Sequence, residues 1–368
     1  MGLRIESVRV RPYRLDFEAP YSTALGTIHH RDIVEVELVS SAGTSGIGEA
    51  TSLSLRGGPT ADAIVDELTG GIASACLTGA NAPSFEGLAT APAITGCVRQ
   101  AIDVCRAAGL GNEALCAIDV ALFDLAGKLC GEPLWRLLGA SRPEPVTCNA
   151  TLVGGDPGAV AADAAAWAAD GFTSFKVKCG LPRDVEVVAA VREAVGPDAA
   201  IRVDANGAWD APTALERLGA MGGAKGIELA EQPCADVVAM GEVRTESGVR
   251  IAADESVVDA DTAASIARLG LADLATVKLA KVGGISAALE IAERLPVYVS
   301  SALDGPVGIA AAAHLIQGLQ ARGTDAGVAH GLATERLFSN WPGDCAHLEG
   351  SLLQVPDGPG HGAGLHEG

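Results

Sequence analysis

The stretch FKVKCG (Phe175–Gly180) places two lysines one residue apart in an otherwise apolar run. The chain has only six lysines, and two more recur in a similar run, TVKLAK (Thr276–Lys281). Burying an ammonium group costs free energy unless the group is paired. Four of six lysines at the ends of two apolar strands therefore indicate a functional site.

Working outward from Phe175, apolar strand-like runs recur along the second half of the chain, and Ala-rich helical segments fill the gaps. The runs begin near Val146, Ser174, Ile201, Ile227, Ile251, Leu274, Val297 and Ala326. Seven or eight βα units with near-continuous apolar strands predict a closed parallel barrel of the α/β class. A doubly wound open sheet is the competing fold, but no Gly-rich phosphate loop follows the first strand, Val146–Leu152.

The first part of the chain follows a different pattern. Residues 4–15 and 32–39 alternate as strands do, and the segment Ala19–Thr27 between them is expected to form a polar loop. Helical segments are predicted at Ala61–Leu77, Ala93–Ala108 and Asn112–Cys130. Strands followed by helices indicate a separate α+β unit. We expect a capping domain over residues 1–135, a barrel over 143–335, and a Gly/Pro-rich segment, 336–368, that returns to the first unit.

Composition narrows the class of protein. With 368 residues, 48% hydrophobic and 20% charged, the chain is long enough for a large core. A net charge of −20 disfavours nucleic acid and anionic membranes as partners. Nine cysteines without a Cys-x-x-Cys pair, and no signal-peptide core at the N-terminus, favour a cytoplasmic protein. The longest apolar stretch, Val307–Ile316, is too short to span a membrane.

Charged side chains stand at the ends of successive predicted barrel strands, where such barrels hold their active sites. Carboxylates follow three strands in order, and lysines end the strands on either side: Lys176, Lys178, Asp204, Glu231, Asp254 and Lys278. A single carboxylate there could equally cap the following helix, and a lysine pair could decorate a solvated edge. Three carboxylates at consecutive strand ends favour a site. Because residues i and i+2 share one face of a strand, both lysines are expected to point into the barrel mouth.

Three converging carboxylates offer an oxygen-only site for a hard divalent cation, which we expect to be Mg²⁺, with Mn²⁺ as an alternative. Such an ion can bind a substrate carboxylate and stabilise the charge that develops when a neighbouring C–H loses its proton. A lysine beside other cations and away from water has a lowered pKa and can act as a general base. Lys178 and Lys278 are expected to face each other across the mouth.

The strand-end motifs resemble those of the enolase superfamily, and within it the muconate lactonizing enzyme subgroup. The motifs are Lys176-x-Lys178, Asp204-x-Asn206, Glu231-Gln232-Pro233, Asp254-Glu255-Ser256 and Lys278. The resemblance covers essentially the whole chain and implies a modified TIM barrel, (β/α)7β, with an N-terminal α+β capping domain completed by the C-terminal tail. It implies Mg²⁺ held by Asp204, Glu231 and Asp254, an enediolate intermediate, and Lys178 and Lys278 as the acid–base pair. Lys176 would tune Lys178, and Asn206 and Glu255 would support the metal site.

Several barrel segments are similar to o-succinylbenzoate synthases of the actinobacterial type. They are Val203–Asp210, Glu231–Ala235, Val297–Leu303, Val307–Ala311 and His330–Thr334. That resemblance implies a syn-dehydration, in which Lys178 takes the proton α to a carboxylate and a β-hydroxyl leaves, with Lys278 stabilising the intermediate. A distal carboxylate is expected at the glycine-containing turn Gly305–Gly308, at a helix N-terminus. Ser301, Gly308 and Thr23 are the expected substrate contacts.

Other activities fit the same lysines, and a fold-level match does not separate them. Muconate cycloisomerase and N-succinylamino acid racemase chemistry are alternatives. Dipeptide epimerases also resemble the chain, but they carry an Asp-x-Asp on the last strand, where this chain has Ala329-His330-Gly331. A non-catalytic binding barrel is the alternative from another class, and it would lack a base or a ligand. The expected partners are a small-molecule carboxylate and further copies of the chain, with neither nucleic acid nor membrane.

Overall fold

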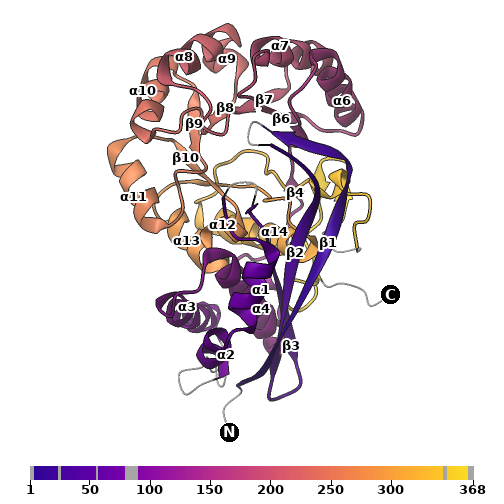
Figure 1. Ribbon diagram of the computed structural model, residues 1–368, viewed down its shortest axis with the longest axis vertical. Helices are drawn as coiled ribbons and strands as arrows, with labels where there is room; N and C mark the ends of the chain where they lie inside the picture. Colours follow the sequence, from indigo (N-terminus) through magenta and orange to yellow (C-terminus); the bar gives the residue numbers. More distant parts are fainter. Residues whose placement is uncertain (1–3, 24–25, 55–56, 79–89, 343–345, 364–368) are drawn as a thin grey trace.

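An antiparallel sheet of three strands opens the chain: β1 (Ile5–Thr23), β2 (Gly26–Ser40) and β3 (Ser45–Thr51). The computed structural model describes residues 4–23, 26–54, 57–78, 90–342 and 346–363. The polar loop expected over Ala19–Thr27 is wrong, because β1 and β2 stay paired as far as Thr23 and Gly26. The ladder is irregular between Asp16 and Tyr21, and the strands then pair again. The resulting hairpin rises alongside the barrel (Figure 1).

Helices follow the sheet, at α1 (Ala61–Thr69), α2 (Gly71–Thr78), α3 (Ala91–Ala107), α4 (Asn112–Cys130) and α5 (Leu134–Leu137). The helix predicted over Asn112–Cys130 is confirmed in its full length. It packs directly on β3, where two glycines allow close approach. A Cβ added at Gly46 would lie 2.2 Å from the carbonyl oxygen of Ala121, and one at Gly48 would lie 2.0 Å from that of Ala117. Larger residues at these glycines would push helix and sheet apart.

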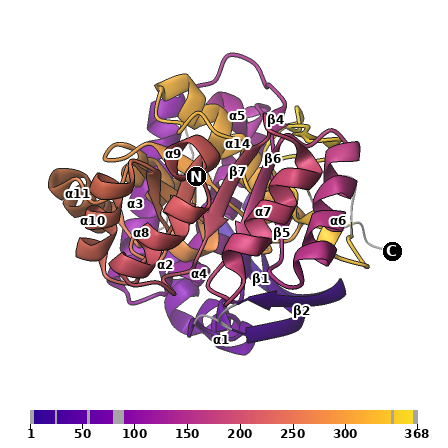
Figure 2. The same ribbon diagram turned by 90° about the horizontal axis from the view of Figure 1, so that it is seen from above.

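Seven parallel strands form the second sheet, in the order β11-β10-β9-β8-β7-β6-β5, with helices outside it (Figure 2). The strands are β5 (Ala150–Leu152), β6 (Ser174–Lys178), β7 (Ala200–Asp204), β8 (Leu229–Glu231), β9 (Arg250–Ala253), β10 (Leu274–Val277) and β11 (Val297–Val299). The helices are α6 (Pro157–Ala169), α7 (Asp184–Val195), α8 (Ala211–Ala220), α9 (Gly223–Gly226), α10 (Val237–Ser247), α11 (Ala260–Leu269), α12 (Leu279–Val282), α13 (Ile285–Ala292) and α14 (Pro306–Arg322). The predicted barrel class is confirmed.

Two of the predicted strands differ from expectation. The run Val146–Leu152 is split: β4 (Val146–Thr147) pairs with the C-terminal strand β13 (Leu352–Leu353), and only β5 joins the barrel. The strand predicted from Ala326 is an irregular segment. It closes the barrel through isolated bridges, Ser300 with Gly331 on one side and Cys148 with His330 on the other. Gly327 has a left-handed φ of 68°, which interrupts the extended backbone that a regular strand requires.

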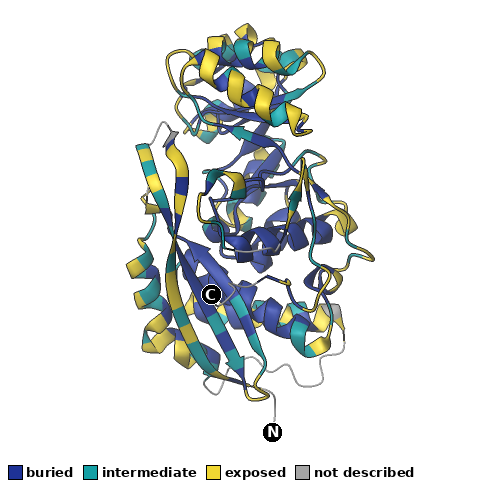
Figure 3. Cartoon of the chain, turned by 90° about the vertical axis from the view of Figure 1, so that its right-hand side faces the viewer, coloured by how far each residue is buried: buried dark blue, intermediate teal, exposed yellow. Residues whose placement is uncertain are grey.

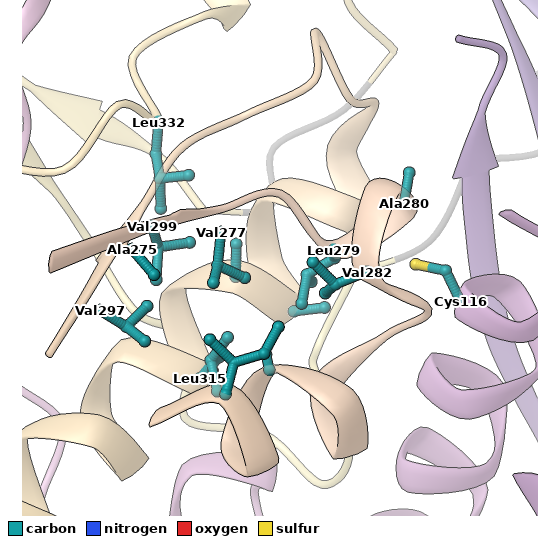
Figure 4. Close-up of a cluster of buried hydrophobic side chains, with 14 of the residues drawn as sticks. Cys116, Ala275, Val277, Leu279, Ala280, Val282, Val297, Val299, Leu315 and Leu332 are labelled. Carbon is teal, nitrogen blue, oxygen red and sulfur yellow. The ribbon is translucent and has the colours of Figure 1, made fainter. Parts of the chain in front are cut away.

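Most residues of the barrel strands are buried, as the dark blue of these strands shows (Figure 3). Apolar residues of β10 and β11 pack against helices α12 and α14, and Cys116 of α4 lies beside that cluster (Figure 4). Inside the barrel, the fully buried Arg202 stacks on Tyr298, with its Cζ 5.0 Å from the ring centroid. Arg202 also binds Glu228 and the carbonyl oxygen of Ala329.

The C-terminal segment returns to the first sheet. Besides β13 it contains η2 (Glu335–Leu337) and β12 (Leu348–Glu349), and Phe338 stacks on Phe17 of β1. His361 of this segment is buried, and its backbone N–H donates to Asp124 of α4. No helix within the described ranges is long and apolar enough to cross a membrane.

Candidate active site

The C-terminal ends of β6 to β10 bring the predicted strand-end residues together. Lys176 and Lys178 lie on β6, and Asp204 and Glu231 are the last residues of β7 and β8. One residue beyond β9 and β10 stand the remaining two, Asp254 and Lys278. All six are buried, and the three carboxylates are almost inaccessible to solvent. A purely surface role for the lysine pair is therefore wrong.

Each carboxylate contacts at least one lysine ammonium group. Lys176 Nζ lies 2.6 Å from Glu231 Oε2 and 2.9 Å from Asp204 Oδ2. Lys178 Nζ lies 2.6 Å from the same Asp204 oxygen. The third carboxylate, Asp254, accepts hydrogen bonds from Lys278 and Lys281. Breaking one such buried pair by removing a partner strands a charge at a cost of roughly 3–5 kcal/mol.

The pKa values of Asp204 and Glu231, the two carboxylates that Lys176 contacts, shift in opposite directions. Burial raises the pKa of Asp204, but Lys176, Lys178 and Lys278 outweigh it and hold that pKa below its ordinary value. The pKa of Glu231 is raised, by burial and by Asp204, because Lys176 is its only close cation in the contacts above. Burial lowers the pKa of Lys176, but Asp204 and Glu231 outweigh burial and hold it well above the usual value. The protonation states of Lys176, Asp204 and Glu231 therefore depend on one another.

The donor set suits a hard divalent cation, since three buried carboxylates supply only oxygen ligands. Glu231 Oε1 is buried and has no hydrogen-bond partner, so one carboxylate oxygen is available for a further ligand. Over the described ranges, however, no three His, Cys, Asp or Glu side chains form a ready-made metal cluster. The ammonium groups of the lysines contact these carboxylates instead. Asp204, Glu231 and Asp254 are therefore the residues that would hold a metal if these groups withdrew.

Neighbouring polar residues fix the strand ends in place. Asn206 donates to Glu255 at 3.0 Å and accepts from Lys178 at 3.3 Å, as expected of residues that support the site. Sequence reasoning missed a second contributor, Gln232, although it belongs to the quoted Glu-Gln-Pro motif. Its Oε1 accepts from the backbone N–H of Asp254 at 2.9 Å, and its φ is +37°, a strained value for a non-glycine residue. Gln232 thereby positions Asp254.

The loop after β11 is organised by Asp304, which follows the predicted contact Ser301. Asp304 Oδ2 accepts from the backbone N–H of Ala302 at 2.9 Å, and Oδ1 accepts from Thr51 of β3 at 2.7 Å. Ser301 Oγ accepts from the Asp304 backbone N–H and from Thr334. Asp304 thus ties the loop to the N-terminal sheet, and Ser301 shapes it.

The helix N-terminus that we expected to hold a distal substrate carboxylate contacts a carboxylate of the protein itself. Glu49 of β3 accepts from the backbone N–H of Val307 at 3.2 Å and from the hydroxyl of Tyr13 at 2.9 Å. A Cβ added at Gly308 would lie 2.8 Å from Glu49 Oε1. The expectation for Gly305–Gly308 is corrected accordingly: Gly308 leaves room for the carboxyl group of Glu49 at the start of α14.

Replacing Glu49 with glutamine is expected to remove a pH dependence of stability. Burial raises the pKa of Glu49 from 4.5 to about 8, and Asp304 adds to the rise. A raised folded-state pKa means that this contribution is fully present below pH 4.5 and is lost as the pH rises to about 8. Between pH 5.5 and 8 the wild type should lose roughly 3 kcal/mol through this group, and Glu49→Gln should lose little.

Thermal unfolding midpoints measured from pH 5.5 to 9 check this expectation. Glutamine keeps an acceptor for Tyr13 and Val307 and has no charge to titrate, so it mimics the protonated form. Glu37→Gln on β2 is a suitable control, because Glu37 is partly exposed and pairs with the exposed Arg9. An equal fall of the midpoint in Glu49→Gln and wild type would contradict the assignment.

A cavity of about 300 Å³ lies at the barrel mouth. Its walls include three lysines predicted from sequence, together with Ser301 and Glu255. Lys281 also lines it; it is among the four lysines that indicate a site, but the sequence assigns it no role. Arg31 lines the cavity too, and sequence reasoning missed it because nothing in the local pattern of β2 marks it. The side chain of Thr23 lies outside the described part of the chain, so its predicted substrate contact stays a prediction.

Two family models match the chain and together span most of it. The model described as "Mandelate racemase / muconate lactonizing enzyme, N-terminal domain" matches residues 5–139, and "Enolase C-terminal domain-like" matches residues 159–368. The hydrophobic dipeptide epimerase of Enterococcus faecalis is 32% identical over 323 residues, which are 85% of this chain and 87% of that protein. The o-succinylbenzoate synthase of Thermobifida fusca is 40% identical over 178 residues, 46% of this chain and 55% of that one.

Solved structures agree with the family models. The dipeptide epimerase from Enterococcus faecalis, complexed with Mg and the dipeptide L-Leu-L-Tyr, superposes with a TM-score of 0.87 at 28% identity, covering 98% of this chain and 99% of that one. The barrel and the N-terminal sheet thus match a solved structure over nearly the whole chain. The protein is a lyase or isomerase of the enolase superfamily, and it belongs to the mandelate racemase/muconate lactonizing enzyme family.

Proposed function

We propose that the protein is a Mg²⁺-dependent enzyme that removes the proton α to a carboxylate, with Lys178 and Lys278 as its acid–base pair. One observation carries this proposal: both lysines line the same cavity from opposite sides of the barrel. In the ring of seven strands and the closing segment, β6 and β10 are four positions apart in either direction. Two groups so placed can reach opposite faces of one carbon.

The other residues of the site are proposed to bind the cation, to act on Lys178 and to position the strand ends. Asp204, Glu231 and Asp254 are the ligands proposed for the cation, because each is buried and ends a strand beside the cavity. When bound, Mg²⁺ would hold the substrate carboxylate and stabilise the negative charge formed as the C–H bond breaks. Lys176 lies between Asp204 and Glu231, so its positive charge favours a neutral amine on nearby Lys178. Gln232 and Asn206 position the neighbouring Asp254 and Glu255 through hydrogen bonds.

We assign the reaction as a syn-dehydration of the o-succinylbenzoate synthase type. The identity to such a synthase is 40% over 178 residues, higher than the 32% over 323 residues found with a dipeptide epimerase, and it supports this assignment. The last barrel segment supports it as well. A Cβ at Gly331 would lie 2.6 Å from Ser300 Oγ, so no acidic side chain fits there to bind a free amino group. Lys178 would take the α proton and a β-hydroxyl would leave.

Racemisation of an N-acylamino acid is the second candidate, and the two lysines favour it. Proton removal on one face and return on the other needs a base and an acid on opposite sides of the α carbon. Lys178 and Lys278 have that placement in the strand order. The N-succinyl-L-Arg/Lys racemase of Bacillus cereus is 34% identical over 215 residues, 55% of this chain and 57% of that one.

Chelation tests the proposal directly. The enzyme with Mg²⁺ should exchange the α proton of N-succinylamino acids, or dehydrate a β-hydroxy carboxylic acid, in D₂O followed by NMR. EDTA should abolish the exchange and added Mg²⁺ should restore it, because the carboxylates alone give no Lewis acid. Isothermal titration with Mg²⁺ provides a readout independent of turnover, and Glu231→Gln should weaken that binding. Exchange that persists without divalent cations would refute the site assignment.

A further inference from the structure

Lys281 is the lysine at the barrel mouth that has no part in the proposed proton transfer. It lies in the last turn of α12, lines the cavity, and has only 13% of its side chain exposed. Its ammonium group donates to three oxygens of the protein. They are Asp254 Oδ1 at 2.7 Å, the carbonyl oxygen of Asp254 at 2.5 Å and the carbonyl oxygen of Thr276 at 3.1 Å.

These contacts make Lys281 an anchor rather than a proton carrier. An ammonium group has three N–H donors, so the three contacts use all of them within the protein. Two of the acceptors are backbone carbonyl oxygens, which neither ionise nor move away with a side chain. Lys281 therefore has a reason to stay in place when another cation approaches the carboxylate of Asp254.

Asp254 is held on both sides of its main chain. Its backbone N–H donates to Gln232 Oε1 at 2.9 Å, and its carbonyl oxygen accepts from Lys281 and from the backbone N–H of Val257. Asp254 stands one residue beyond the end of β9, so the ladder of the sheet does not fix it. Lys281 is the group that binds both its main chain and its carboxylate.

The N-terminal domain in turn fixes Lys281. Asn112, the first residue of α4, donates through Nδ2 to the carbonyl oxygen of Lys281 at 2.8 Å. Helix α12 packs on α4, and Cys116 of α4 points toward α12 (Figure 4). Gly283 follows α12 with a left-handed φ of 96°, and a Cβ there would lie 3.3 Å from Asn112 Oδ1. Contacts therefore run from Asn112 through Lys281 to Asp254.

We propose that Lys281 is a positioning residue, which holds Asp254 in place for the divalent cation and is itself secured by Asn112 of the N-terminal domain. The inference rests on the function proposed above. It adds a role for the fourth lysine and a route by which the N-terminal domain acts on the cation site. Partners that orient the ligands of a metal typically change its affinity 10- to 100-fold when they are replaced.

Isothermal titration with Mg²⁺ tests the proposal without turnover. Lys281→Met keeps an unbranched side chain and removes the N–H donors, and it should bind Mg²⁺ roughly 10- to 100-fold more weakly than the wild type. Loss of a positive charge alone would strengthen cation binding, so the direction of the change separates positioning from simple repulsion. Lys281→Arg should restore part of the affinity, because a guanidinium group can also donate to carbonyl and carboxylate oxygens.

Lys225→Met is the matched control, since Lys225 is exposed on α9 and its replacement changes the net charge equally. It should bind Mg²⁺ as the wild type does. Equal or tighter binding by Lys281→Met would overturn the proposal. If that variant does not fold, Asn112→Ala decides: loss of one hydrogen bond to Lys281 should weaken Mg²⁺ binding by roughly 2- to 10-fold. Unchanged affinity in Asn112→Ala would then overturn it.

Proton exchange measured against Mg²⁺ concentration separates this inference from the proposed function. Lys281→Met should need more Mg²⁺ for half-maximal exchange, by the same factor as in the titration, and should approach the wild-type rate at saturation. A rate that stays low at saturating Mg²⁺ would overturn the positioning role, because Lys281 would then take part in the chemistry. Weaker Mg²⁺ binding in Lys281→Met, with no exchange in the wild type, would refute the proposed function and leave the role of Lys281 standing.

Discussion

Replacing Lys178 with alanine is expected to lower α-proton exchange by roughly 10²- to 10⁴-fold, the usual contribution of a positioned general base. Lys178 lines the cavity and lies 2.6 Å from Asp204, a proposed ligand of the cation. Lys278→Ala should have a comparable effect if Lys278 also transfers a proton. NMR in D₂O with Mg²⁺ and both enantiomers of an N-succinylamino acid checks these values, since each lysine should serve mainly one enantiomer in a racemase.

The same experiment distinguishes the two candidate reactions. In a dehydration with a single base, Lys178→Ala loses exchange and Lys278→Ala slows turnover without favouring one enantiomer. Lys225→Ala is the control, because Lys225 is exposed on α9 and removes the same charge far from the strand ends. If both active-site variants exchange as fast as Lys225→Ala, the assignment of the two lysines is wrong.

Replacing Arg202 with leucine is expected to destabilise the fold by about 3–5 kcal/mol, because several hydrogen-bond partners in the barrel interior lose their donor at about 1–3 kcal/mol each. Arg202 is fully buried inside the barrel, where it binds Glu228 and Ser174 and donates at 2.7 Å to the carbonyl oxygen of Ala329. Ala329 belongs to the irregular segment that closes the barrel, and Arg202 takes the place of missing ladder bonds there. Chemical denaturation should show the loss.

Arg9→Leu on β1 gives the matched control for this loss. Arg9 is mostly exposed and pairs with Glu37, and such surface pairs contribute little to stability. Equal denaturation midpoints for Arg202→Leu and Arg9→Leu would show that the interior of the barrel tolerates loss of the charge. A large loss in Arg202→Leu alone would support its role in closing the barrel.

Much of the barrel could be predicted because its strands are short apolar runs at regular spacing. The strands near Ser174, Ile201, Ile251, Leu274 and Val297 were found within a residue or so of their observed starts. The first and last strands were not, because their pairing depends on distant partners. Val146 pairs with Leu353 of the C-terminal segment rather than with the barrel. Local sequence carries no information about a partner some 200 residues away.

The outer part of the β1–β2 hairpin, predicted as a loop over Ala19–Thr27, was missed for a related reason. Its residues near Tyr21 are small and polar, which is typical of loops, but pairing between the two strands overrides that preference. A substrate-binding role for Gly308 was expected because glycine next to a helix start often admits an anion. The carboxyl group of Glu49 fills that position instead, and it comes from a strand more than 250 residues earlier in the chain.

The sequence by itself determined which charged groups lie together at the barrel mouth. Lysines are so few in this chain, and carboxylates stand so regularly at the strand ends, that Lys178, Asp204, Glu231, Asp254 and Lys278 could be named from spacing alone. Parallel strands bring their carboxyl ends to one edge, so the order along the chain already places these groups together. Only the tertiary structure decided what faces them. Arg31 and Glu49 meet the barrel through domain packing, which depends on contacts between segments that no local pattern links.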